Sequence, residues 1–215
     1  MQAYLKVIYY LLLVAGFFLL LVRRKKLGRI SVLFTLLYAF NIITQVIYDT
    51  PMSRHVNPFL LYHINQFISA TIFHIYYYML LTQPIFRKVI VAGYVLFSTY
   101  FVFHFILVPE NIVTLDFTDF ALEGLLVCIY VVFFLTELYK SNIIVILQKN
   151  PDVIISIGNL IFFSGCMFVM GFSNYLKNNN SELYSKVVYI NYVLNILLYS
   201  LYFKAFLCNW KMKQS

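Results

Sequence analysis

Seven apolar stretches of about 20 residues follow one another along the chain, and short polar breaks separate them. A helix needs roughly 20 mostly apolar residues to cross a hydrocarbon core of about 30 Å. Each stretch is therefore long enough to span a bilayer, and little of the 215 residues is left for a soluble domain. The expected spans are residues 3–22, 30–48, 59–81, 89–108, 120–139, 153–173 and 185–207.

The composition agrees with a membrane protein, because 62% of the residues are hydrophobic and 11% are charged, whereas soluble domains are about a quarter charged. Only helices and closed barrels satisfy their own backbone in lipid, and barrel strands are about 10 residues long with strict alternation. The five prolines all fall in the breaks. The sequence therefore predicts an all-α fold, a single seven-transmembrane-helix bundle over residues 1–215. Residues 1–22 are interpreted as the first span, since the basic residues follow this apolar run and a secretory signal carries them before it.

The positions of Lys and Arg predict the orientation, since short cytoplasmic loops retain positive charge. With the N-terminus outside and the C-terminus in the cytoplasm, twelve of the 16 basic residues lie on the inner side. The four on the outer side are Lys6, Arg54, Lys177 and Lys186. The net charge of +8 is then explained by contact with anionic lipid headgroups, and nothing indicates nucleic acid.

Polar side chains recur at one depth in several of the predicted spans. At a rise of about 1.5 Å per residue, five of them lie roughly 8–10 Å to the outer side of the middle of their spans. Polar groups at such depths usually face the bundle interior or a watery cavity, since facing lipid costs several kcal/mol. Gln66 shares a helix face with one of the histidines of this set. The candidate ligand-binding residues are Gln45, His63, Gln66, His104, Glu123 and Asn191.

Glu123 is the strongest candidate, because an intramembrane carboxylate is a functional hypothesis by default. Its expected partners at the same depth are His63 and His104. Two imidazoles and a carboxylate are also zinc ligands, but these three come from separate spans without a spacing motif. We therefore predict no metal and no cofactor, and we keep these three residues as the candidates should a metal bind.

Two further features carry local predictions. The consecutive Tyr76, Tyr77 and Tyr78 are expected in the interfacial belt where aromatic side chains gather. Residues 141–150 contain several apolar side chains in a longer break. They are interpreted as an interfacial helix along the inner leaflet or as a continuation of the fifth span.

The stretches NPDVIISIGNLIFFSG, residues 150–165, and NILLYSLYFKAFLC, residues 195–208, resemble an uncharacterised family of small bacterial seven-pass integral membrane proteins. The resemblance covers mainly the last two spans. It implies the seven-helix architecture and a multi-pass location in the cell membrane, the bacterial inner membrane, and it implies no activity.

The leading hypothesis for function is a receptor-like or sensory module. A small-molecule ligand would bind between the outer halves of the helices, and the basic inner face would contact a cytoplasmic signalling protein. Two alternatives stay open, an intramembrane lipid-modifying enzyme (a hydrolase, with or without zinc) and a small-solute transporter. A bundle in which the polar groups only join helices to one another is the remaining interpretation.

Overall fold

The computed structural model describes residues 2–50, 56–106, 118–141, 149–179 and 181–208. These residues form six helices and no strand, which confirms the predicted all-α class. The prediction for residues 141–150 concerns mainly positions 142–148, which lie outside the described residues. The helices are α1 (Gln2–Asp49), α2 (Pro58–Leu80), α3 (Pro84–Ile106), α4 (Thr118–Lys140), α5 (Pro151–Asn179) and α6 (Ser181–Leu207).

Five of these helices are long and apolar enough to cross a membrane, as expected for a multi-pass membrane protein. They are α1, α3, α4, α5 and α6. α2 is of similar length and carries histidines, amides and hydroxyls along its sequence. The exposed positions of the bundle carry many large apolar side chains, among them Phe18, Val95, Leu125, Val132 and Phe168, as a lipid-facing surface requires.

Three of the prolines begin helices. Pro58, Pro84 and Pro151 are the first residues of α2, α3 and α5. This is where proline suits a helix, because the first backbone N–H groups have no partner within the helix and its fixed φ matches helical geometry. The chain breaks predicted from the prolines are therefore present at these three positions.

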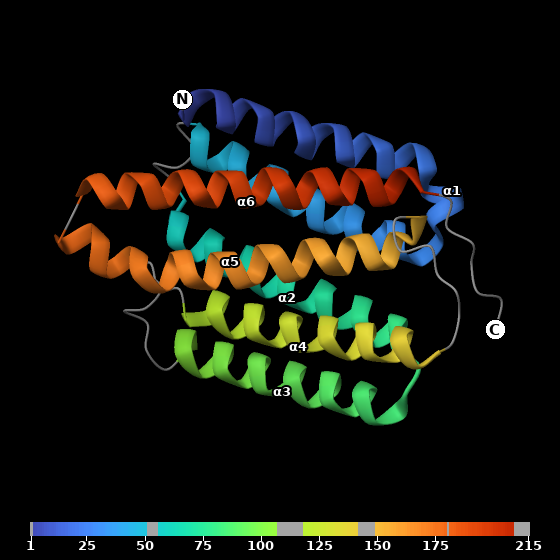
Figure 1. Cartoon of the computed structure of the whole chain (residues 1–215). Coiled ribbons are helices and arrows are strands. Elements are labelled where there is room, and N and C mark those ends of the chain that lie inside the picture. The colour runs from blue at the N-terminus through green and yellow to red at the C-terminus, as the bar shows by residue number, and fades with distance from the viewer. Residues whose placement is uncertain (1, 51–55, 107–117, 142–148, 180, 209–215) are drawn as a thin grey trace.

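α1 bends sharply at Gly28, which has φ 59° and ψ −139°. A straight helix of its 48 residues would be roughly 72 Å long. Instead the bend divides it into two arms, residues 2–27 and 29–49, and Figure 1 shows the second arm returning alongside the first. The break predicted between residues 22 and 30 is wrong in its extent, because the helix continues through Arg23–Lys26 and is interrupted only at Gly28. Arg and Lys are good helix formers.

Contacts between the two arms fix their antiparallel packing. Lys6 Nζ lies 2.6 Å from Asp49 Oδ1, and the Tyr10 hydroxyl donates to Gln45 Oε1 at 3.3 Å. The Tyr10 hydroxyl also contacts the Asp49 carboxylate. These pairs join residues that are 35 to 43 positions apart in the chain, so the first arm begins beside the end of the second arm.

α2 contacts four other helices of the bundle. It packs against α1, α3 and α4, and its Tyr77 reaches Asn159 of α5. Its buried face carries His63, Gln66 and His74, while Ile64 and other apolar residues of the helix are exposed. The polar side chains on this buried face are thus shielded from lipid by the neighbouring helices, which accounts for so many polar groups in a membrane protein.

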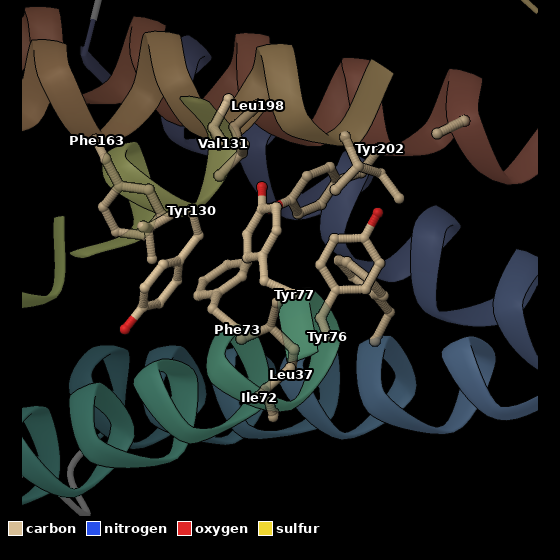
Figure 2. Packing of buried hydrophobic residues seen from close by; sticks show 14 of the residues in the cluster. Leu37, Ile72, Phe73, Tyr76, Tyr77, Tyr130, Val131, Phe163, Leu198 and Tyr202 are labelled. Atoms are coloured by element: carbon tan, nitrogen blue, oxygen red, sulfur yellow. The ribbon is translucent and has the colours of Figure 1, made fainter. Parts of the chain in front are cut away.

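The core of the bundle is aromatic. Tyr76 and Tyr77 are 1% and 0% exposed, so the interfacial prediction is wrong for these two, whereas Tyr78 is 44% exposed. Figure 2 shows Tyr77 extending from α2 toward Tyr202 of α6. Asn159 joins them, since its Nδ2 donates to the Tyr77 hydroxyl at 2.9 Å and its Oδ1 accepts from Tyr202. The tyrosines could be buried because their hydroxyls have partners there.

Candidate functional site

A cavity of about 80 Å³ lies inside the bundle. Five helices contribute to its wall, namely α1, α2, α4, α5 and α6. The polar lining residues are Asn41, Asn65, Gln66, Ser69, Glu123 and Asn195. The apolar and aromatic lining residues are Leu37, Phe73, Phe120, Phe162, Phe163, Leu198, Tyr199 and Tyr202. Figure 2 shows the positions of five of these, Leu37, Phe73, Phe163, Leu198 and Tyr202. A few convergent polar groups in an apolar wall are typical of a ligand site.

Glu123 supplies the carboxylate of the cavity. It lies on the buried face of α4, with Phe120 and Val127 one turn to either side, and its own exposure is 0%. Ser69 Oγ donates to Glu123 Oε1 at 3.1 Å. Glu123 Oε2 is buried and has no hydrogen-bond partner. One carboxylate oxygen is therefore available for a bound group.

A short chain of amides fixes the orientation of Asn65. Asn41 Nδ2 donates to the Leu37 carbonyl at 2.8 Å, and Asn65 Nδ2 donates to Asn41 Oδ1 at 3.2 Å. A carbonyl only accepts, so the Asn41 amide must point its nitrogen at Leu37 and its oxygen at Asn65. Asn65 Oδ1 is then left buried and without a partner. Gln66 Nε2 is also buried without one.

His63 forms a second buried arrangement one helical turn from the cavity residues. Its Nδ1 lies 2.8 Å from Asp119 Oδ2, and both side chains are 1% exposed. The other Asp119 oxygen accepts the Phe120 backbone N–H at 2.8 Å, and the Phe105 ring packs 4.3 Å from the imidazole. A carboxylate can only accept here, so His63 Nδ1 carries the hydrogen. The partner of His63 is therefore Asp119, and the pairing expected with Glu123 is wrong.

The six residues selected from the sequence lie in different surroundings. Gln66 and Glu123 line the cavity. Asn191 lies beside it, because its Oδ1 accepts from Asn195 Nδ2 at 3.2 Å and from the Cys166 thiol. The other three lie elsewhere: His63 with Asp119, Gln45 with Tyr10 between the arms of α1, and His104 beside Tyr100 on α3.

The candidate metal ligands do not converge. His63, His104 and Glu123 contact Asp119, Tyr100 and Ser69 respectively. Within the described parts of the chain, no group of three or more His, Cys, Asp or Glu side chains is arranged to hold a metal ion. The geometry of zinc binding, with three protein ligands and water, is therefore absent from the described residues.

A second hollow of about 210 Å³ lies between α2 and α3. Its lining is largely apolar, with Ile75, Ile90 and Val91 beside the rings of Tyr78 and Tyr94. Exposed apolar residues of α2 and α3 border it.

Sequence reasoning missed six polar residues of the cavity or its surroundings: Asn65, Ser69, Asp119, Asn159, Asn41 and Asn195. The first two lie on α2, within the same polar run as Gln66, and the third is one turn before Glu123 on α4. The spacing of Asp119 and Glu123, four residues apart on one helix face, is a signal that could have found the His63 pair.

Comparisons with known protein families, curated proteins and solved structures find no match for the chain.

Proposed function

We propose that this chain is a receptor-like membrane module that binds a small polar ligand in the cavity around Glu123. The observation that carries the proposal is the convergence of three buried, unpartnered polar atoms, Glu123 Oε2, Asn65 Oδ1 and Gln66 Nε2, from residues that line one cavity. A buried polar atom without a hydrogen bond costs about 1–3 kcal/mol. A ligand that satisfies these atoms recovers that free energy on binding.

The size of the cavity restricts the ligand. Pockets for drug-sized molecules have volumes of about 300–1,000 Å³, whereas this cavity has about 80 Å³. The ligand is therefore an ion or a molecule of a few heavy atoms, together with water where space remains.

The proposed topology has seven spanning segments, namely the two arms of α1 and each of the other five helices. The contacts between the arms support this, since Lys6 and Asp49 lie at the same end of the bundle. The bend then lies at the opposite end, where Arg24, Lys25, Lys26 and Arg29 are exposed or half-exposed. Short basic loops favour the cytoplasm, so the N-terminus lies outside. The membrane is the cell membrane, and a bacterial inner membrane follows from the resemblance alone.

α6 offers a route from the cavity to the basic end. Asn195 and Tyr199 line the cavity, and the last carbonyls of the same helix, those of Phe206 and Leu207, accept from Arg23 at 2.9 and 2.6 Å. Asn195 and Phe206 are separated by roughly 16 Å along the helix. A ligand that binds one position of α6 better than another shifts the helix population and with it the Arg23 contacts beside the basic face.

The enzyme alternative has one observation in its favour, the His63–Asp119 pair. An imidazole held through Nδ1 by a carboxylate has the orientation of a general base. However, its Nε2 is buried, has no partner, and does not line the cavity. A general base must reach the proton that it removes, so the pair as it stands is better explained as an interhelical contact.

A thermal-shift screen of purified protein against ions and small polar compounds tests the binding proposal. We expect at least one compound to raise the melting temperature of the wild type and of Glu137→Gln, but not of Glu123→Gln. Glu137 is the matched control, because it lies on the same helix and binds the Thr82 and Gln83 backbone away from the cavity. If Glu123→Gln retained every response, the cavity would not be the binding site.

Single-cysteine labelling tests the topology. Cys128, Cys166 and Cys208 are first replaced by alanine, and one cysteine is then introduced at the exposed Val56 or at Ser141. A membrane-impermeant maleimide applied to intact cells should label Val56→Cys and should reach Ser141→Cys only after the membrane is opened. The opposite pattern would place the basic end outside.

A further inference from the structure

When Glu123 is ionised, no described side chain in its surroundings balances its charge. No Lys, Arg or His in the described parts of the chain forms an ion pair with it, since Lys6 pairs with Asp49 and His63 with Asp119. Removing an ionised carboxylate from water costs many kcal/mol unless it is paired, protonated or bound to a cation. Ser69 donates a single neutral hydrogen bond to Oε1 and leaves Oε2 without a partner.

The second unpartnered oxygen at the cavity is also an acceptor. The amide chain through Asn41 to the Leu37 carbonyl holds Asn65 so that its Oδ1 is left over. A carboxylate oxygen and an amide oxygen are the ligand types that hard cations prefer, and both also accept hydrogen bonds from an ammonium group. An anion would meet the Glu123 carboxylate, so the polar lining selects against it.

The charge of the ligand follows from the number of carboxylates available. Asp119 is the nearest other acid on α4, and its two oxygens are engaged by His63 and by the Phe120 N–H. Glu123 therefore acts alone, and one carboxylate balances one positive charge. Calcium sites in proteins use six to eight oxygens and commonly several carboxylates, which the described lining residues do not offer.

We propose that the ligand of this cavity is a small monovalent cation, an alkali metal ion or a protonated small amine, held between Glu123 Oε2 and Asn65 Oδ1. The inference rests on the proposed binding function and adds the chemical class of the ligand. The cavity of about 80 Å³ accommodates such a cation with a few waters. A water beside the cation can accept from Gln66 Nε2, which is a donor and does not itself contact a positive charge.

Cation titrations of the purified full-length protein test the proposal. Thermal unfolding is followed with a fluorogenic maleimide, which reacts as the buried thiol of Cys166 becomes exposed. The probes are sodium, potassium, ammonium and methylammonium chloride, each exchanged against N-methylglucamine chloride to keep the ionic strength constant. The neutral probes urea and formamide form a parallel series.

We expect a saturable rise in melting temperature with at least one small cation and none with N-methylglucamine. The half-saturating concentration should increase by about tenfold or more in Glu123→Gln, where the charge is lost. It should increase by about three- to tenfold in Asn65→Ala, where one neutral acceptor is lost. Glu137→Gln should respond as the wild type does. A response to sodium or potassium alone identifies a metal ion, and a stronger response to ammonium or methylammonium identifies an amine.

The other outcomes separate this inference from the proposed function. If the neutral probes stabilise the protein and the cations do not, a binding cavity exists and the cation assignment is overturned. If neither series produces a saturable shift, both proposals fail. Should Glu123→Gln not fold, equal responses of the wild type to small cations and to N-methylglucamine would overturn the inference without any variant.

Discussion

Replacing Gly28 with alanine should destabilise the packing of the two α1 arms. The residue has φ 59° and ψ −139°, a combination that side chains with a Cβ rarely adopt. Arms joined by an alanine must either keep this strained backbone or change the angle between them. The second course would separate Lys6 from Asp49 and Tyr10 from Gln45, which are now in contact.

The magnitude follows from two opposing effects. A non-glycine residue held in a sparsely populated backbone region costs about 1–3 kcal/mol. Alanine also restricts the unfolded chain more than glycine does, which stabilises the protein by about 0.4–1 kcal/mol. We therefore expect Gly28→Ala to lower the free energy of unfolding by about 1–2 kcal/mol.

Gly158→Ala is the matched control, because it is the same chemical change at a helical glycine of α5. A Cβ built there would lie 3.4 Å from Leu198 and Leu201 side-chain atoms, an ordinary van der Waals distance. Alanine is the better helix former by about 1 kcal/mol, so this variant should be as stable as the wild type or more stable.

Reversible unfolding by SDS in mixed micelles, followed by the helical circular dichroism signal, measures both variants against the wild type. We expect the SDS midpoint to fall for Gly28→Ala and to stay or rise for Gly158→Ala. A wild-type midpoint for Gly28→Ala would refute the argument from backbone strain. Equal losses in the two variants would show that any added methyl group disturbs the bundle.

Three further predictions concern the polar contacts. Asn159→Leu removes the amide that donates to Tyr77 and accepts from Tyr202, while Tyr77 keeps Ser156 as a partner, and it should cost about 1–3 kcal/mol in the same SDS titration; an unchanged midpoint would contradict the network. Arg23→Ala should raise amide hydrogen exchange in the last turn of α6 by about three- to tenfold, measured by mass spectrometry, and unaltered exchange there would show that the arginine does not hold this end. A double-mutant cycle compares His63→Leu, Asp119→Leu and the double variant with the wild type. We expect a coupling free energy of about 1–3 kcal/mol between the two residues, and a value near zero would count against the pair.

The elements of the fold could be predicted from the sequence because membrane helices have a simple length requirement. α2, α3 and α4 begin and end within a few residues of the predicted spans. α5 extends further, to Asn179 and not residue 173, and α6 begins earlier, at Ser181 and not residue 185. The count of seven spans stays a prediction, which the bend in α1 supports.

The depth of the polar residues was easier to predict than their partners. The constant rise of a helix converts sequence position into depth, and Gln66 and Glu123 do line one cavity. Which residue of a neighbouring helix faces them depends on rotation and on an offset of one turn, about 5.4 Å. Asp119 and Glu123 differ by about one turn, so the sequence could not decide which of them meets His63.

Asn159 shows a different limit. It is fully buried on α5 and forms hydrogen bonds with Tyr77 and Tyr202. Tyr77 was expected at the membrane interface, and no role was predicted for Tyr202. The position of Asn159 is nearer the basic end of the bundle than the level at which polar groups recur, so the argument from a common depth could not find it. Tyrosines are equally at home at interfaces and in a core that satisfies their hydroxyls, and composition does not distinguish the two.

The contrast between Asn159 and the polar residues of the cavity is an argument for a ligand. Around Asn159 the bundle gives each polar atom of the buried amide a partner, with Tyr77 accepting from Nδ2 and Tyr202 donating to Oδ1. At the cavity, in the same bundle, Glu123 Oε2 and Asn65 Oδ1 have no partner. If polar groups served only to join helices, both sites would be expected to pair their atoms as the first does. Other buried polar atoms, among them the Tyr38 and Tyr130 hydroxyls, also lack a partner, but Glu123 Oε2 and Asn65 Oδ1 belong to residues that line a cavity. A cation bound in that space would satisfy both oxygens.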